Sequence, residues 1–221
     1  MANKIPTALV SDFDGTISDD DFFNYVSRRW LGEKALDPWR EYTEGKKTHF
    51  EALREIFASL RVEQPAFDDF IREIKIDPGF FTVADYCRRR DIPVYVCSAG
   101  CDYYIDKLAG KEMADCRVRL VANNGVYSPE TGLVMTPPPE NSPFYDPNTG
   151  ISKAAVVAYL QQRGYRVVYC GDGMPDVAAA AIADVVFARK MLLLQCRQLN
   201  IPAEELTDFN QVYRFLKGEK Q

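Results

Sequence analysis

The sequence predicts an α/β fold in which helices cover both faces of a parallel β-sheet. Four apolar runs have the length and residue types of strands buried on both faces, and segments with helical spacing separate them. Strands that alternate with helices are joined by crossover connections, which makes the sheet parallel. A stretch with helical spacing alone, from about residue 22 to residue 70, follows the first apolar run. We therefore expect a three-layer α/β core with one small helical insertion.

Length and composition fit a globular protein with a large hydrophobic core. The chain has 221 residues, of which 47% are hydrophobic and 27% are charged, as in an ordinary soluble domain. No apolar run reaches the roughly 18 residues of a membrane span, and residues 1–6 contain no apolar signal-peptide region. We expect a cytoplasmic protein with no membrane partner. The sequence leaves its oligomeric state open.

Charge, cysteine and histidine content narrow the kinds of site. The net charge of −5 argues against a nucleic-acid surface, which needs a basic face. The six cysteines form no C-x-x-C pair, and Cys97 and Cys170 lie in strand-like runs, so we interpret them as reduced thiols. The single histidine, His49, argues against a histidine-rich zinc site and a Ser-His-Asp triad. A metal bound here would have oxygen ligands, which favours Mg²⁺.

The first predicted strand, residues 8–10, leads into the sequence S-D-F-D-G-T at 11–16. Asp12 and Asp14 follow the strand, and Gly15 permits a sharp turn, so the loop can aim both carboxylates at one point. Their repulsion is unfavourable unless a cation or a division of protonation states relieves it. The motif therefore favours a metal site, acid–base chemistry or both. Taken alone, it also fits a solvated acidic turn.

The helical insertion has its own start signal and its own boundary. Ser18 or Asp19 can act as an N-cap, and residues 51–57 are the clearest amphipathic stretch. Asp77-Pro78-Gly79 marks its end. We expect an α/β core at 1–18 and 78–221, with a helical cap at 19–77.

The remaining chain alternates between predicted helices and strands. The expected helices are 81–90, 103–109, 151–163, 176–183, 191–196 and 210–216, and the expected strands are 92–97, 117–122, 166–170 and 184–188. Asn123-Asn124-Gly125 is a turn signal. Five prolines predict an extended loop at 136–147, which we interpret as a rigid surface connection or, alternatively, as a wall of the active-site entrance.

Polar side chains follow three of the predicted strands. Asp12 and Asp14 follow the first, Ser98 the second and Asp172 a later one. In open parallel sheets the ligand crevice lies at the carboxyl ends of the strands, so these groups are expected to converge. Lys153 begins a helix whose N-terminus faces the same edge and attracts anions.

Four motifs in this order resemble those of the haloacid dehalogenase superfamily of phosphatases. They are residues 8–16, the sequence V-Y-V-C-S-A-G at 94–100, Lys153, and G-D-G-M-P-D at 171–176. With the helical insertion, the resemblance covers most of the chain. It implies a Rossmann-like three-layer core (the haloacid dehalogenase-like fold) carrying a helical cap after the first motif.

The resemblance implies a role for each acid. Asp12 attacks phosphorus and forms an aspartyl-phosphate, and Asp14 protonates the leaving alcohol and then deprotonates water. Asp12, the backbone carbonyl of Asp14, and Asp172 bind Mg²⁺, with Asp176 either a further ligand or directly behind the ligands.

The same resemblance implies a phosphate-binding group. Ser98 and Lys153, with backbone N–H groups near Ala99 and Gly100, hold the phosphoryl oxygens. Taken singly, Ser98 also fits a helix cap, Lys153 an exposed helix cation and Asp176 a helix-start acid.

The cap narrows the branch and the substrate. An acid at position 14 resembles phosphatases and phosphomutases, and an insertion after the first motif resembles the phosphoserine phosphatase-like branch. Asp21 lies near that branch's substrate-binding acid, but Ile56 or Phe57 replaces its arginine. The cap and residues 187–197 look closer to the methionine-salvage phosphatases. The substrate of those enzymes, 2-hydroxy-3-keto-5-methylthiopentenyl-1-phosphate, has an apolar thioether end. We expect this end to contact aromatic residues of the cap or core, namely Phe22, Phe23, Phe57 or Tyr103. Packing of the cap and core alone also explains these aromatic residues.

We therefore expect a Mg²⁺-dependent hydrolase of a small-molecule phosphate monoester, with a methionine-salvage-type substrate as the first candidate. A phosphoserine phosphatase and a phosphomutase sharing the same motifs are the enzyme alternatives. A phosphate-binding module without activity is the alternative outside enzymes, although no essential acid is missing from this chain.

Overall fold

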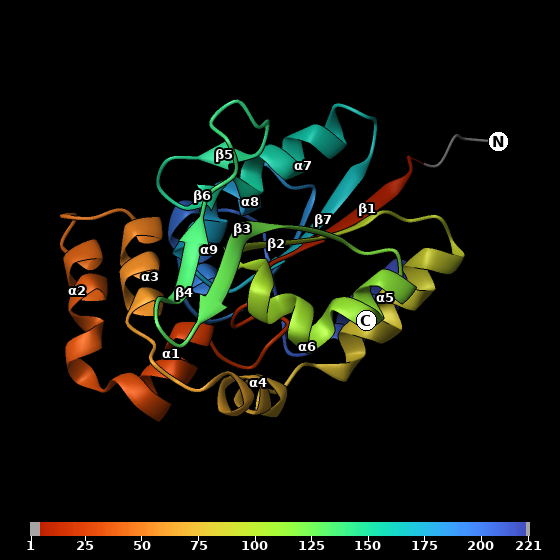
Figure 1. Ribbon diagram of the computed structural model, residues 1–221. Helices are drawn as coiled ribbons and strands as arrows, with labels where there is room; N and C mark the ends of the chain where they lie inside the picture. Colours follow the sequence, from red (N-terminus) through yellow and green to blue (C-terminus); the bar gives the residue numbers. More distant parts are fainter. Residues whose placement is uncertain (1–4, 220–221) are drawn as a thin grey trace.

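The computed structural model describes residues 5–219, and at its centre is a seven-stranded sheet with the order β4-β3-β2-β1-β7-β8-β9 (Figure 1). All neighbouring pairs are parallel except β3 and β4. The strands are β1 (Thr7–Ser11), β2 (Val94–Cys101), β3 (Arg119–Ser128), β4 (Gly132–Thr136), β7 (Arg166–Gly171), β8 (Val185–Ala188) and β9 (Glu204–Glu205). A separate small ribbon pairs β5 (Tyr145–Asp146) with β6 (Gly150–Ile151). Residues 1–4, which belong to the stretch expected to lack a signal peptide, lie outside the described residues. Residues 220–221, at the end of the predicted core, also lie outside them.

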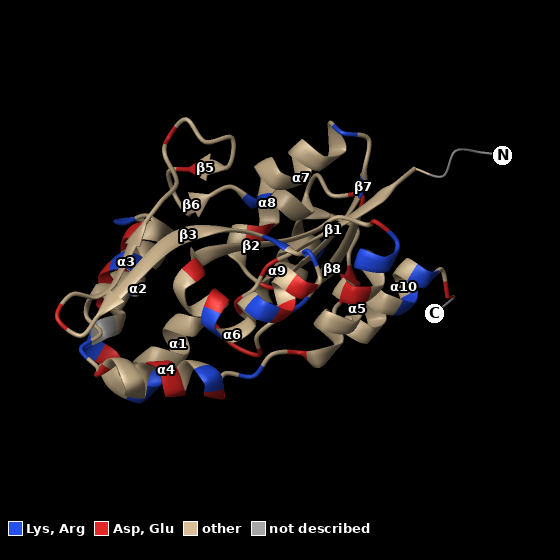
Figure 2. Cartoon of the chain, turned by 45° about the vertical axis from the view of Figure 1, so that its right-hand side comes forward, with Lys and Arg blue, Asp and Glu red and all other residues tan. Residues whose placement is uncertain are grey.

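Residues on the central strands alternate between the two faces of the sheet. On β1, Leu9 packs into one hydrophobic cluster, whereas Ala8 and Val10 pack into the other. Both faces are apolar because helices cover both, and charged residues therefore lie mainly on helices and loops (Figure 2). The first cluster contains side chains of α5 (Pro78–Arg89), α6 (Asp102–Asp115) and α10 (Phe209–Lys217); the second contains those of α7 (Lys153–Gln161), α8 (Val177–Ala180) and α9 (Lys190–Leu199). The three-layer prediction is confirmed.

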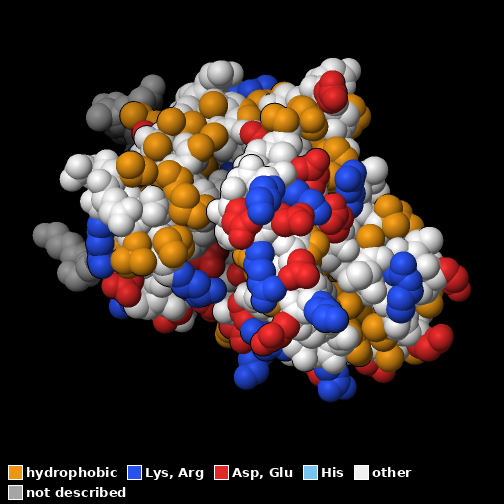
Figure 3. All heavy atoms as spheres, turned by 90° about the vertical axis from the view of Figure 1, so that its left-hand side faces the viewer, with side chains coloured by type: hydrophobic (Ala, Val, Ile, Leu, Met, Phe, Trp, Pro, Cys, Tyr) orange, Lys and Arg blue, Asp and Glu red, His pale blue; other side chains and the backbone are white. Residues whose placement is uncertain are grey.

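Residues 22–73 form helices and no strand, as their spacing predicts. The segments are α1 (Phe22–Val26), η1 (Ser27–Leu31), η2 (Glu33–Leu36), α2 (Asp37–Thr43), α3 (His49–Ala58) and α4 (Gln64–Glu73). The start of α3 is fixed by a capping box, in which Thr48 accepts from the Glu51 amide and Glu51 accepts from the Thr48 amide. On the face that carries α2 and α3, acidic and basic side chains are interspersed (Figure 3).

The two chain segments that connect the helices to the sheet run side by side. Ser18 and Ile76 form an antiparallel bridge, and the amides of Asp19 and Asp77 donate to the carbonyls of Lys75 and Ile17. The far side of the helical segment is also anchored. Asn148 accepts from the amides of His49 and Phe50, and the Tyr127 hydroxyl bonds the backbone of Val62.

The expected turn at Asn123-Asn124-Gly125 is wrong, because these residues lie inside β3. Asn123 is fully buried, and its amide donates to the carbonyls of Ala99 and Thr149. A side chain at Gly125 would place its Cβ 2.6 Å from the Cys101 sulfur. Asn123 and Gly125 are therefore required for close packing at the point where β3 leaves β2 and pairs with β4.

Other helices and strands begin or end a few residues away from the positions expected from the sequence. β2 extends through Ser98, Ala99 and Gly100 to Cys101, with an irregularity in register against β3, whereas a strand ending at residue 97 is expected from sequence. The helix expected at 176–183 is limited to α8 after a short 3-10 turn, η3 (Met174–Asp176). The six cysteines are unpaired, and Cys97 and Cys170 are buried in strands as expected. Among the described residues, no helix is long and apolar enough to cross a membrane.

Candidate active site

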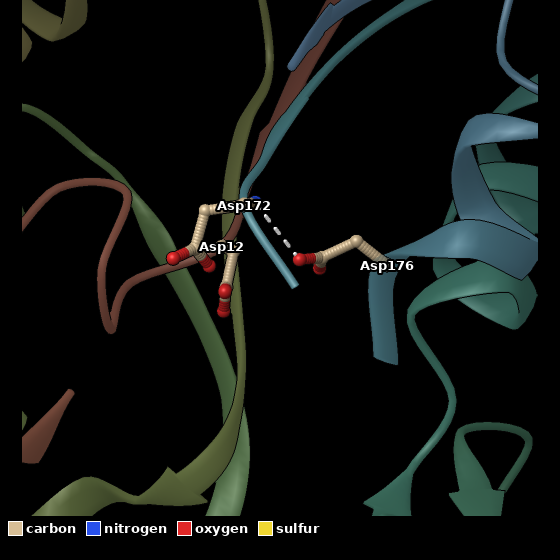
Figure 4. A group of neighbouring side chains, drawn as sticks. All are labelled: Asp12, Asp172 and Asp176. Atoms are coloured by element: carbon tan, nitrogen blue, oxygen red, sulfur yellow. Dashed lines mark hydrogen bonds between the residues drawn. The ribbon is translucent and has the colours of Figure 1, made fainter. Parts of the chain in front are cut away.

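Three buried aspartates meet at the carboxyl ends of β1 and β7. One carboxylate oxygen from each of Asp12, Asp172 and Asp176 lies within 4.8 Å of the others. Asp12 follows β1, Asp172 follows β7 and Asp176 ends η3. Figure 4 shows the carboxylates of Asp12 and Asp172 close together, with Asp176 approaching from the other side. Acids more than 150 positions apart in the sequence therefore share one site, as the strand-end argument predicts.

Gly15 makes the turn that follows β1 possible. Its φ of +70° lies in the left-handed region, which favours glycine. A Cβ at this position would lie 2.1 Å from an oxygen of Asp172 and 2.8 Å from Lys190 Nζ. Both the backbone conformation and the close approach of Asp172 therefore require a residue without a side chain.

Lys153 is almost fully buried against these acids. Its Nζ lies 2.7 Å from Asp12 Oδ1 and 2.6 Å from Asp176 Oδ1. Burial alone would lower the pKa of Lys153, but the two carboxylates outweigh burial and raise it. Ser152 caps α7 and so fixes the backbone from which this side chain projects. The lysine is therefore a fixed positive charge within the acidic cluster.

Both oxygens of Asp176 are already engaged. Lys153 and the Tyr169 hydroxyl donate to Oδ1, and the amides of Asp172 and Gly173 donate to Oδ2, at distances between 2.6 and 3.0 Å. Asp176 thus holds the loop that carries Asp172. By contrast, Asp12 Oδ1 pairs with Lys153, and Asp172 Oδ2 with Lys190 at 3.1 Å.

The cluster fits a hard divalent cation. Burial and the neighbouring Asp176 raise the pKa of Asp12 and of Asp172, and the lysines only partly oppose this. Carboxylate oxygens gathered at one point with surplus negative charge are the donor set that Mg²⁺ prefers. The donor chemistry and the unfavourable crowding of charge therefore both match the expected metal site.

Asp14 occupies a separate position beside the cluster. The hydroxyls of Ser98 and Tyr104 donate to its Oδ2 at 2.9 and 2.5 Å, and the Phe22 amide donates to Oδ1 at 3.2 Å. Burial raises the pKa of Asp14, although the three donors act in the opposite direction. A carboxyl group that holds its proton more tightly than usual is suited to general acid catalysis.

The expected phosphate-binding residues lie at this edge but are partly engaged with one another. Ser98 is fully buried, its hydroxyl donates to Asp14, and its oxygen accepts from the Gly100 amide at 2.9 Å. Ala99, Gly100 and Lys153 line the adjacent cavity.

A cavity of about 390 Å³ lies between the strand ends and the helical segment. The predicted substrate-contacting residues Asp21, Phe22 and Phe57 line it, as does Phe23. Tyr103 does not, and its place is taken by the next residue, Tyr104, which stacks on Phe22 with ring centroids 3.9 Å apart. Among the described residues that line the cavity, none belongs to the proline-rich segment 136–147, which favours its interpretation as a surface connection.

Several lining residues are not identified by sequence reasoning. They are Trp39, Tyr42, His49, Leu53, Tyr104, Lys190 and Met191, among others. Lys190 follows a buried strand, which is the signal that identifies Asp12 and Asp172, so the same rule would have found it. The aromatic residues carry no sequence signal that separates cavity lining from packing.

Asp21 lines the cavity at the position where α1 begins. Burial, with the nearby charges of Asp14 and Asp172, raises the pKa of Asp21 to about 7, and Lys190 opposes this shift. Its carboxyl group is therefore half protonated near neutral pH, unlike an ordinary exposed aspartate.

Comparisons with known proteins agree with this geometry. The profile of the haloacid dehalogenase-like hydrolase family matches residues 9–181. A 2-hydroxy-3-keto-5-methylthiopentenyl-1-phosphate phosphatase of Brevibacillus brevis is 29% identical, over 100% of this chain and 99% of the relative. A polyol phosphate phosphatase of Saccharomyces cerevisiae is 28% identical, over 98% and 96%. The structure of a substrate-bound phosphoserine phosphatase complex is similar in fold, with a TM-score of 0.67, 17% identity, and coverage of 96% of this chain and 99% of that one.

Proposed function

The chain belongs to the haloacid dehalogenase-like hydrolase family, and we propose that it is a Mg²⁺-dependent phosphatase that hydrolyses a small-molecule phosphate monoester. The observation that carries the proposal is the convergence of Asp12, Asp172 and Lys153 beside Asp14. In this proposal Asp12 is the nucleophile, Asp14 is the acid and Lys153 is a cation at the same edge of the sheet. Relatives named as phosphatases match over nearly the whole chain, which supports the same reaction class.

In the first chemical step, a carboxylate oxygen of Asp12 forms a bond to phosphorus as the bond to the ester oxygen breaks. Asp14 gives its proton to the departing oxygen, which leaves as an alcohol. In the second step water attacks the phosphorus of the aspartyl-phosphate, Asp14 takes a proton from that water, and the Asp12–phosphorus bond breaks. Inorganic phosphate and the starting protonation states result.

The surroundings of each acid support this division of roles. The ion pair with Lys153 favours the ionised form of Asp12, which a nucleophile requires, against the burial and the Asp176 charge that raise its pKa. Asp14 is bonded by neutral hydroxyl and amide donors, and burial raises its pKa. The Ser98 hydroxyl has one proton, and that proton is directed to Asp14. To bind a phosphoryl oxygen, Ser98 must turn this proton away from Asp14, so phosphate binding and release of the acid are coupled.

Asp12, Asp172 and the backbone carbonyl of Asp14 are the proposed ligands of Mg²⁺. When bound, the ion neutralises the repulsion between the Asp12 carboxylate and the phosphate dianion. Asp176 receives four hydrogen bonds from protein donors. We therefore assign it to holding Lys153 and the Asp172 loop in place, ahead of direct ligation.

We further propose that the organic part of the substrate is uncharged, as in a methionine-salvage-type ester. Among residues 5–219, the cations that line the cavity are Lys153 and Lys190, and both are paired with aspartates. Arg54 lies over the Phe50 ring and does not line the cavity. A second carboxylate on the substrate would therefore find no free cation in the described part of the chain. This disfavours phosphoserine, after which the fold neighbour is named, and favours compounds of the kind named for the Brevibacillus and yeast relatives.

A division into a core at 1–18 and 78–221 and a cap at 19–77 is part of the proposal. The paired connections at Ser18 and Ile76 support it, because they coincide with the predicted boundaries.

The test is hydrolysis of p-nitrophenyl phosphate with and without Mg²⁺. We expect turnover that excess chelator abolishes and that Asp12→Asn lowers by at least about 10⁴-fold. Asp69→Asn makes the same chemical change at an exposed position on α4 and is the matched control. Undiminished turnover in Asp12→Asn or in chelator would overturn the mechanism. Transfer of the phosphoryl group to a second sugar phosphate in preference to water would identify the phosphomutase alternative.

A further inference from the structure

The helical wall of the cavity contains a buried imidazole that has no hydrogen-bond partner among residues 5–219. His49 begins α3, is 6% exposed and lines the cavity. Its Nδ1 atom is cut off from solvent and forms no hydrogen bond within the described chain. A molecule in the cavity can therefore reach the ring only through Nε2, which also has no partner in that part of the chain. A polar atom at a cavity wall without a protein partner is available to a bound molecule.

Aromatic packing holds the imidazole of His49 in place but provides no hydrogen bond to its ring nitrogens. The rings of Trp39 and Tyr42 contact it edge-on, with centroids 5.4 and 5.3 Å away. The His49 amide is separately occupied by Asn148. The amide and two sides of the ring thus have protein contacts, whereas Nε2 has no hydrogen-bond partner among the described residues.

The imidazole is neutral in this position. Burial, with the positive charge of Lys153, lowers the pKa of His49 to about 4, and the charge of Asp176 only partly opposes this. A neutral imidazole offers one N–H donor and one acceptor nitrogen. It is therefore suited to a hydroxyl or carbonyl oxygen and poorly suited to a second anionic group.

We propose that His49 is a specificity-determining residue that hydrogen-bonds a hydroxyl or carbonyl oxygen on the uncharged part of the substrate. The inference rests on the proposed phosphatase function and adds the group that selects among neutral phosphate esters. The polar edge at Asp12 and Asp172 binds the phosphoryl end, and His49 faces the same cavity from α3. The apolar neighbours Phe23, Leu53 and Phe57 also line this wall. A substrate with phosphate at one end, an oxygen substituent, and an apolar or small remainder is complementary to this arrangement.

The first test compares two esters that differ only in hydroxyl groups, sn-glycerol 3-phosphate and n-propyl phosphate. We expect the native protein to have a higher kcat/KM for the hydroxylated ester, and His49→Phe to reduce this preference by roughly tenfold. His49→Gln, which keeps a donor and an acceptor, should restore part of it. Arg54→Gln changes an exposed residue of the same helix and serves as the control with unchanged preference.

The ratio between the two esters separates recognition from structural damage. A general loss of activity lowers kcat/KM for both esters equally and leaves their ratio unchanged. That result would overturn the proposed role of His49. The native protein failing to hydrolyse any ester with Mg²⁺ is a different outcome and refutes the proposed function itself.

A second measurement avoids substitution at this position. Because the chain has one histidine, ¹⁵N NMR of the imidazole reports on His49 alone. In Asp12→Asn with Mg²⁺, sn-glycerol 3-phosphate should shift the ring nitrogen signals and n-propyl phosphate should not. Equal shifts with both esters, or none with either at saturation, would contradict the proposal.

Discussion

Lys153 and Phe57 lie on opposite walls of one cavity, but different interactions hold them. The strand-end wall contains buried charges, each with several polar partners, such as the two carboxylates on Lys153. The helical wall is held by aromatic packing, for example the edge contact of Phe22 with Phe57 at 5.4 Å. Loss of one partner in the first wall leaves an unpaired buried charge, whereas packing in the second can adjust. Under the proposed function, the chemistry belongs to the wall of paired buried charges, and substrate choice belongs to the wall of packed aromatic rings.

After Asp12→Asn, the largest effect is expected for Asp14→Asn on the strand-end wall. Loss of the proton donor should lower turnover of an alkyl phosphate by about 10²–10⁴-fold. Because p-nitrophenolate leaves without protonation, p-nitrophenyl phosphate should instead give a rapid burst of product followed by slow turnover. Rapid-quench and stopped-flow kinetics measure both. Equal losses for the two esters with no burst would remove the acid role.

Lys153→Met tests whether the strand-end wall depends on its charge pairs. The substitution leaves Asp12 and Asp176 without their buried cation, so we expect the free energy of unfolding to fall by about 3–5 kcal/mol. Urea unfolding in chelator measures this. Lys46→Met removes an exposed pair with Glu44 and should change stability by less than about 0.5 kcal/mol. A similarly small change in both variants would mean that the buried pairs are not important for stability.

Phe57→Ala and Phe67→Ala sharpen the account of the helical wall. Both rings are buried, and each truncation should cost about 3 kcal/mol of stability. Only Phe57 lines the cavity, so only its truncation should change the ratio of kcat/KM between a bulky apolar ester and methyl phosphate, by roughly tenfold. If Phe67→Ala changes this ratio as much, the selectivity arises from the whole helical segment and not from the lining.

The smallest expected effect concerns Asp21, between the two walls. Its pKa is raised, so the ionised form is less favourable in the folded than in the unfolded protein, and stability is lost as pH rises through about 7. Asp21→Asn removes this loss. In chelator, its stability relative to the native protein should therefore increase by about 1–2 kcal/mol between pH 5 and pH 8.

Asp20→Asn is the matched control for Asp21. Burial would raise the pKa of Asp20, but Asn24, Arg28 and the Asp21 amide outweigh it and lower the pKa. The stability that Asp20 contributes is therefore lost only as pH falls below the ordinary aspartate range, and its variant should show a constant difference from pH 5 to pH 8. A constant difference for Asp21→Asn as well would refute the raised pKa.

The strand-end wall could be predicted from sequence because parallel strands bring their carboxyl ends to one edge. Asp12, Asp14, Ser98 and Asp172 were identifiable by this rule alone. The central strands and helices such as α5, α6 and α7 could also be predicted from apolar spacing. The β3–β4 hairpin could not be predicted, because Asn123 and Gly125 are typical turn residues and their burial depends on distant partners, Ala99 and Cys101.

The helical wall was predicted less completely for a related physical reason. Phe22 and Phe57 line the cavity as expected, but Tyr103 points into the packing of Phe67 and Tyr127 and its neighbour Tyr104 reaches Asp14. On a helix, adjacent residues face different directions, and the direction of each depends on where the helix is docked. Periodicity identifies a buried stripe without distinguishing a protein neighbour from a ligand.

The antiparallel bridge between Ser18 and Ile76 lies where the chain enters and leaves the helical segment, so any displacement of these helices from the core would bend the backbone there. Such a displacement would also have to break the contacts of Asn148 with α3 and of Tyr127 with Val62. Backbone amides at His49 and Val62 should therefore exchange with deuterium before the Asp77 amide, which lies beside the bridge.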